Sequence, residues 1–186
     1  MTDAALTARV ATFAATGTLS TTQDLVRGVL PALTAQADPE LVAEETLVLV
    51  ATVSARAAEV GLASRPGALA ALGPALAELP FLYHDYLLGA QLVADGAEGD
   101  HEPDQSVYDR LARKAEFYAV HLAPGAFPGP RQLGDKMALW MGRVSPPRLP
   151  TSPQARLAEL GLVEVVAAHA RLVLAFAQRA AGEPTG

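Results

Sequence analysis

The stretch that decides the fold is residues 38–61, DPELVAEETLVLVATVSARAAEVG. Asp38 followed by Pro39 is typical of a helix start, because an aspartate side chain caps free backbone N–H groups and proline fits the first helical turn. Residues 46–55 carry no charge and are apolar around the whole helix, which is typical of a helix surrounded by other helices. We therefore predict a central core helix over residues 39–60, ended by Gly61.

The rest of the chain reads as amphipathic helices separated by glycine and proline. A capping box at Ser20–Gln23 predicts a helix start, and Gly17 predicts the end of the helix before it. The remaining predicted helices cover residues 3–15, 67–79 with an interruption at Gly73-Pro74, 81–94, 104–122, 134–141, and 153–181 with a bend at Gly161; the helix that begins at Ser20 is kinked or split at Pro31. We predict an all-α bundle of about seven helices around the central helix, with a single domain over 1–181 and a flexible tail over 182–186.

Bulk composition limits the classes of function. The chain has 186 residues, a net charge of −6 and no cysteine, which excludes disulfides, thiolate metal sites and thiol nucleophiles. An acidic chain disfavours general nucleic-acid binding, which needs a basic face. The start MTDAALTARV lacks a basic segment followed by an apolar one, and no apolar run is long enough for a membrane span, so we expect a cytoplasmic protein.

Apolar content predicts association. Hydrophobic residues make up 51% of the chain, and mean hydropathy is +0.22. This is more apolar surface than one small domain comfortably hides, so a homodimer or a protein partner is expected.

The side chains suited to chemistry are concentrated in residues 81–140, which hold three of the four histidines and most of the aromatic residues. Helical bundles build ligand sites from side chains on facing helices. The hypothetical ligand pocket between the helices would be lined by Tyr83, His84, Tyr86, Tyr118, His121 and His169. The alternative interpretation is that these are core or boundary residues, each with its own hydrogen bond.

A basic region follows on glycine- and proline-rich loops around Trp140. Arginine pairs bidentately with phosphate or carboxylate, so Arg131, Arg143 and Arg148 are candidates for anion binding, with a solvated surface as the alternative. Met137, Trp140 and Met141 would form an apolar contact surface for a dimer or partner, because tryptophan and methionine are frequent at interfaces.

Metal and hydrolase motifs are absent from the sequence. A di-iron bundle needs Glu-x-x-His on one helix face, but the pairs Glu116–His121 and Glu164–His169 are five residues apart and point in different directions. The acidic loop at 95–104 lacks calcium-loop spacing, and no nucleophile elbow precedes a histidine. We predict no metal and no cofactor.

Two family resemblances can be stated. Residues 81–124, ending in FYAVHLAP, resemble part of the C-terminal helical domain of acyl-CoA dehydrogenase-like proteins. The flavin-binding and catalytic domains of that family have no counterpart here, so the resemblance implies no dehydrogenase activity. Residues 45–61 and the final helix are similar in pattern to the carboxymuconolactone decarboxylase-like all-helical family, whose peroxidase members need a Cys-x-x-Cys that this chain lacks.

The leading functional hypothesis is a non-enzymatic helical protein that acts through an apolar or aromatic surface in association with itself or a protein partner. The first alternative is a small-molecule-binding protein or enzyme that uses the tyrosine and histidine pocket. The second, weaker alternative is nucleotide or nucleic-acid binding by the loops between Arg131 and Arg148.

Overall fold

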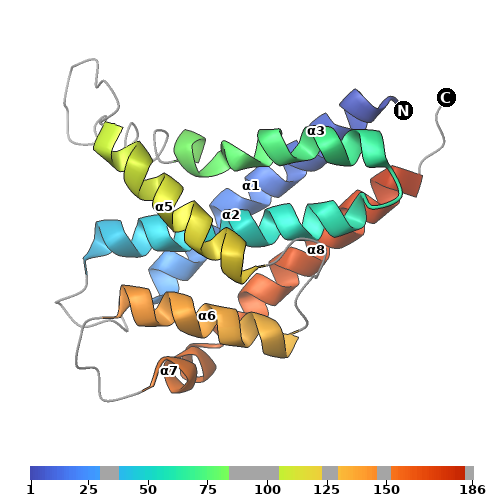
Figure 1. The fold of residues 1–186 in the computed structure, drawn as a ribbon. Helices are drawn as coiled ribbons and strands as arrows, with labels where there is room; N and C mark the ends of the chain where they lie inside the picture. Colours follow the sequence, from blue (N-terminus) through green and yellow to red (C-terminus); the bar gives the residue numbers. More distant parts are fainter. Residues whose placement is uncertain (30–37, 84–104, 123–129, 146–151, 183–186) are drawn as a thin grey trace.

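The protein is an all-α bundle (Figure 1). A computed structural model describes residues 1–29, 38–83, 105–122, 130–145 and 152–182, and within these ranges every regular element is a helix. The helices are α1 (Asp3–Val29), α2 (Pro39–Gly61), α3 (Pro66–Ala77), α5 (Gln105–His121), α6 (Pro130–Val144), α7 (Pro153–Leu160) and α8 (Leu162–Gly182). Residues 79–83 are also helical. The predicted fold class is therefore confirmed.

Helix α2 lies at the centre, as the sequence predicts. It packs against α1, α3, α5, α6 and α8, and α5 lies across it in Figure 1. Its start is fixed by Asp38, whose Oδ1 accepts hydrogen bonds from the backbone N–H groups of Glu40 at 3.0 Å and Leu41 at 3.3 Å. Every residue from 44 to 51 is buried, so the continuously buried segment includes both adjacent glutamates.

Helices α1, α2 and α8 form the innermost group. Gly28, Gly17 and Phe13 of α1 lie against residues of increasing number on α8, in the order Leu162, His169 and Phe176, so α1 and α8 are antiparallel. Ser54 and Gly61 of α2 lie against His169 and Ala177, so α2 and α8 run in the same direction. The contact between the antiparallel helices α1 and α8 is called the α1–α8 seam below.

The predicted break in α1 is wrong. Helix α1 continues without interruption from Asp3 to Val29, through Gly17 and Ser20. The glycine is there for packing, because a Cβ atom on Gly17 would lie 2.7 Å from Cε1 of His169 on α8. Ser20 lies within the helix, so it does not cap a helix start. Close approach between helices and a helix end call for the same residue type, and the sequence pattern does not separate them.

Other boundaries differ in smaller ways. Helix α3 contains Pro74 without a break, and α6 begins and ends several residues outside the predicted range of 134–141. Gly61 is the last residue of α2, but it contacts α8 and has no left-handed backbone. The predicted kink at Pro31 and most of the predicted helix 81–94 lie outside the described residues.

The predicted bend in the last helix is a full break. Gly161 adopts φ 62° and separates α7 from α8, which meet at 70°. In the described part of the chain, no helix on its own has the length and apolar composition needed to cross a membrane; only the bent pair α7 and α8 meets those criteria when taken together.

Helix α6 contributes its apolar stripe to the core. Leu133, Met137, Trp140, Met141 and Val144 are all buried in a cluster with residues of α2, α5 and α8. Met137, Trp140 and Met141 were expected to form an apolar contact surface for a dimer or partner, and this prediction is wrong because all three are buried. Trp140 and Met141 follow Met137 by three and four residues, so all three lie on one face of α6, and that face is covered by the chain itself.

Candidate functional site

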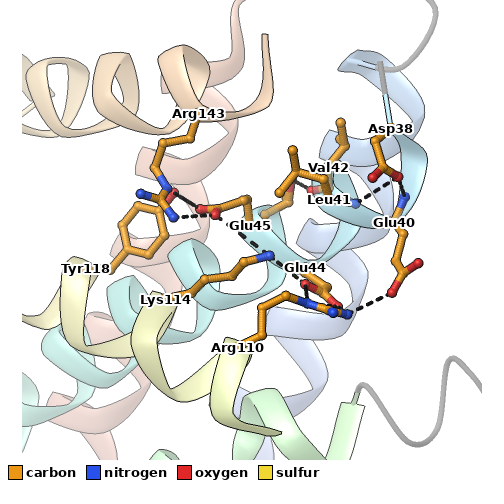
Figure 2. A network of polar contacts seen from close by, with 11 residues as sticks. Asp38, Glu40, Leu41, Val42, Glu44, Glu45, Arg110, Lys114, Tyr118 and Arg143 are labelled. Atoms are coloured by element: carbon orange, nitrogen blue, oxygen red, sulfur yellow. Dashed lines mark hydrogen bonds and ion pairs between the residues drawn. The ribbon is translucent and has the colours of Figure 1, made fainter. Parts of the chain in front are cut away.

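Two adjacent buried glutamates, Glu44 and Glu45, organise a polar network between α2, α5 and α6 (Figure 2). Arg110 donates from Nε to Glu44 at 2.9 Å, and Lys114 Nζ lies 2.5 Å from the same carboxylate. Glu45 accepts a hydrogen bond from the Tyr118 hydroxyl at 2.8 Å. Arg143 of α6 completes the set, with Nε at 2.8 Å and Nη2 at 2.6 Å from the two Glu45 oxygens. This set is called the glutamate clamp.

The clamp joins three helices because of simple spacing. Arg110, Lys114 and Tyr118 are four residues apart on α5, so they share the face that packs on α2. Neighbouring positions on a helix point about 100° apart, so Glu44 and Glu45 serve different partners. Glu44 pairs with α5, whereas Glu45 joins α5 to α6. The sequence signal was present as two carboxylates beside an uncharged helix segment, but their partners lie far along the chain.

The pKa shifts of the clamp residues indicate a structural role and not proton transfer. Burial alone would raise the pKa of Glu44, but hydrogen bonds from Arg110 and Lys114 outweigh it and lower that pKa overall. Burial, together with the negative charge of Glu45, raises the pKa of Tyr118 above its ordinary value. The hydrogen bond to Glu45 raises the pKa of Arg143. Each shift moves a group further from neutral pH, so these groups are poorly suited to proton transfer near pH 7.

A hollow of about 170 Å³ lies beside the clamp at the start of α2, lined by Asp38, Glu40, Leu41, Glu44, Arg110 and Lys114. Its charged groups pair with one another, since Arg110 also donates to Glu40 at 2.8 Å and Asp38 caps α2. An ionic ligand would have to displace one of these internal pairs.

A second buried polar cluster joins α1, α2 and α8. Ser54 Oγ lies 2.7 Å from Nε2 of His169 and 2.7 Å from the Thr18 hydroxyl oxygen, and it donates to the carbonyl oxygen of Val50 at 2.9 Å. Burial lowers the pKa of His169 to about 4. A serine beside a histidine is the start of a hydrolytic arrangement, but Ser54 is fully buried and offers a substrate no access. This Thr18–Ser54–His169 cluster is called the hydroxyl–histidine junction.

An apolar groove lies on the outer side of the α1–α8 seam. It has a volume of about 460 Å³ and is lined by Ala8, Arg9, Thr12, Phe13, Thr16 and Phe176. The rings of Phe13 and Phe176 are stacked at 4.1 Å between centroids with an interplanar angle of 2°. The Arg9 guanidinium carbon lies 5.9 Å from the centroid of the Phe176 ring. This feature is called the phenylalanine groove.

The predicted tyrosine and histidine pocket is not assembled by its described members. Tyr118 donates to Glu45, while the His121 ring packs against Phe117 in a tilted arrangement, at 4.5 Å between ring centroids. His169 belongs to the hydroxyl–histidine junction, and Tyr83 packs on the cluster around α3, where burial raises its pKa. The other two members, His84 and Tyr86, lie outside the described residues.

The structure describes the side chain of one arginine of the predicted anion site, Arg143. Arg143 does bind a carboxylate, but that carboxylate is Glu45 of the same chain, and the guanidinium also lies 4.5 Å from the centroid of the Phe117 ring. The side chain of Arg131 and all of Arg148 lie outside the described residues. Arg56 of α2 pairs with Glu59 at 2.8 Å. In the described ranges, no three His, Asp or Glu side chains are grouped so that they could hold a metal ion.

Comparison with known proteins gives no further assignment: no protein-family model, curated protein or solved structure matches the chain. The two family resemblances therefore stay predictions. The phenylalanine groove was missed by sequence reasoning, because Phe13 and Phe176 lie 163 positions apart and each fits the core stripe of its own helix.

Proposed function

We propose that this protein is a non-enzymatic helical protein that self-associates through the phenylalanine groove. The observation that carries the proposal is the stacked pair Phe13 and Phe176 on the outer side of the α1–α8 seam. Phe13 remains 36% exposed despite this stacking. Stacked aromatic rings at an open groove offer a large apolar contact area with few side-chain rotamers to immobilise.

The apolar surface continues along α8. Val165, Leu172 and Phe176 are seven and four residues apart, so they form one stripe at the edge of the buried face of the helix. Leu172 is 61% exposed and projects one turn before Phe176. The face therefore carries both a hollow and a projecting side chain.

A second copy of the chain is the partner that this arrangement supports. A two-fold interface uses the same patch on both subunits, so that patch has to be complementary to itself. A groove beside a projecting leucine meets this requirement, because Leu172 of each copy would enter the groove of the other. The content of 51% hydrophobic residues supports the same proposal.

We also propose that the homodimer is located in the cytoplasm. The lack of cysteine supports a reducing compartment. The alternatives of a tyrosine and histidine pocket and of anion binding at the arginines draw no support from the described residues.

The exposed leucines provide a matched test. Leu172 and Leu82 are both 61% exposed, but only Leu172 lies beside the groove. Leu172→Ser is expected to weaken dimerisation roughly 100-fold to 10,000-fold, because burying a leucine side chain contributes about 1.5 to 3 kcal/mol and both copies in the two-fold dimer lose it. Leu82→Ser is expected to leave the dimer dissociation constant unchanged. Sedimentation velocity over a dilution series measures both constants.

An equal change in the dissociation constant for both serine variants would contradict the proposal, because association would then not depend on this face. Thermal unfolding of the two variants serves as the control for folding, because both substitutions lie on the surface and should cost little stability.

A further inference from the structure

The hydroxyl–histidine junction lies directly beneath the α1–α8 seam. Gly17 contacts the ring of His169, and Phe13, one turn earlier on α1, contacts Phe176, which lies two turns after His169 on α8. The junction and the phenylalanine groove are therefore successive contacts of one antiparallel helix pair. A change that separates the helices at His169 would also disturb the stacked rings.

The contacts of Ser54 match one tautomer of neutral His169. When Ser54 donates its single hydroxyl proton to the carbonyl oxygen of Val50 at 2.9 Å, its oxygen accepts from both Thr18 and His169, each 2.7 Å away. In this arrangement the neutral ring carries its proton on Nε2 and leaves Nδ1 unprotonated.

A second proton would have to bind at Nδ1, where the packing opposes it. A Cβ atom added to Gly17 would lie 3.1 Å from Nδ1, so this nitrogen faces the α1 backbone at a glycine. His169 is 6% exposed, and its Nε2 already contacts Ser54. Protonation would place an N–H group and a positive charge at a poorly hydrated site against the α1 backbone.

Among the described residues, no neighbouring charge offsets this cost. Gly17 of α1 faces the ring, Ser54 of α2 hydrogen-bonds to it, and Thr18 of α1 hydrogen-bonds to Ser54; none of these groups ionises between pH 4 and pH 8. On the same elements, Arg56 pairs with Glu59, and Arg171 of α8 is exposed. Burial is the one cause of the low pKa of His169, so the ring responds to pH without compensation from a carboxylate.

We propose that the hydroxyl–histidine junction is an acid-sensitive latch, in which protonation of His169 releases α8 from α1 and α2 and opens the phenylalanine groove. The effect on the dimer rests on the proposed function, but the release of α8 does not. The pKa of His169 is lower in the folded form than in the unfolded form. The folded form is therefore fully stabilised at pH values above about 6.5, and this stabilisation is lost as the pH falls from about 6.5 toward 4. Opening becomes roughly 30-fold more favourable at about pH 5 than at about pH 8.

The test is hydrogen exchange of the α1 and α8 amides in the full chain, corrected for the intrinsic pH dependence of exchange. Protection is expected to fall roughly 30-fold between about pH 8 and about pH 5 in the natural chain. His169→Gln keeps an N–H donor for Ser54 and cannot take up a proton, so its protection is expected to be independent of pH over this window. His121→Gln, at a half-buried histidine outside the junction, is expected to behave like the natural chain.

Two results would overturn the latch. One is a titration of His169 near its ordinary pKa, followed by NMR of the imidazole protons in the natural chain; this readout needs no variant to fold. The other is an equal loss of protection in the natural chain and in His169→Gln. Sedimentation under the same conditions separates the two proposals: a chain that is monomeric at neutral pH contradicts dimerisation, while the exchange data still decide on the latch.

Discussion

Replacing Glu45 by alanine is expected to lower the free energy of unfolding by about 3 to 5 kcal/mol. The carboxylate is 1% exposed and accepts hydrogen bonds from Tyr118 and Arg143. Its removal leaves the Tyr118 hydroxyl buried without its acceptor and separates α5 from α6. Because Arg143 is partly exposed and can regain water, the lower end of this range is expected. Urea unfolding followed by circular dichroism measures the change.

Glu40→Ala is the matched control, since Glu40 is also a carboxylate of α2 paired with an arginine. Glu40 is 68% exposed, and exposed ion pairs contribute about 0 to 1 kcal/mol. Its replacement should therefore change the free energy of unfolding by less than about 1 kcal/mol. Similar losses for Glu40→Ala and Glu45→Ala would mean that the glutamate clamp does not hold α5 and α6 on α2.

Gly61→Ala is expected to destabilise the protein by about 1 to 3 kcal/mol or more, although alanine is the better helix former. The added Cβ would lie 2.4 Å from Cβ of Ala177 and 3.0 Å from the carbonyl oxygen of Leu174. These are atoms close to or within the α8 backbone, so no flexible side chain can move to make room. The helices would have to shift apart at the C-terminal end of α2, and the urea midpoint would fall.

Gly142→Ala isolates the helix propensity from this clash. Gly142 lies inside α6, and among the described residues a Cβ there would meet only Cγ of Pro153 at 3.9 Å, which is an ordinary contact. This variant is expected to gain about 0.5 to 1 kcal/mol. A stabilised Gly61→Ala variant would show that α2 and α8 are not in close contact at this point.

Local sequence signals predict most of the fold. The Asp38-Pro39 start and the uncharged segment that follows identify α2 as the central helix, because the residues that signal capping and burial all belong to that helix. The same holds for the left-handed Gly161, which ends α7. The errors are at Gly17 and Trp140. Both depend on which distant helix lies opposite, and no local pattern carries that information.

The candidate sites were less predictable for the same reason. The glutamate clamp joins residues 66 to 98 positions apart, and Phe13 meets Phe176 across nearly the whole chain. Arg110 and Lys114 are four residues apart and therefore share one face of α5, but the partner of that face lies on α2. Concentration of aromatic residues in 81–140 was a poor guide, because Tyr118 and Trp140 are core residues.

Self-association through the phenylalanine groove is tested by the mass of the natural chain in solution. Sedimentation equilibrium over a dilution series is expected to give twice the chain mass of 19.3 kDa at high concentration, with dissociation on dilution. The chain has no cysteine, so disulfide cross-linking cannot produce a false dimer. A mass of one chain at every concentration would contradict the proposed function.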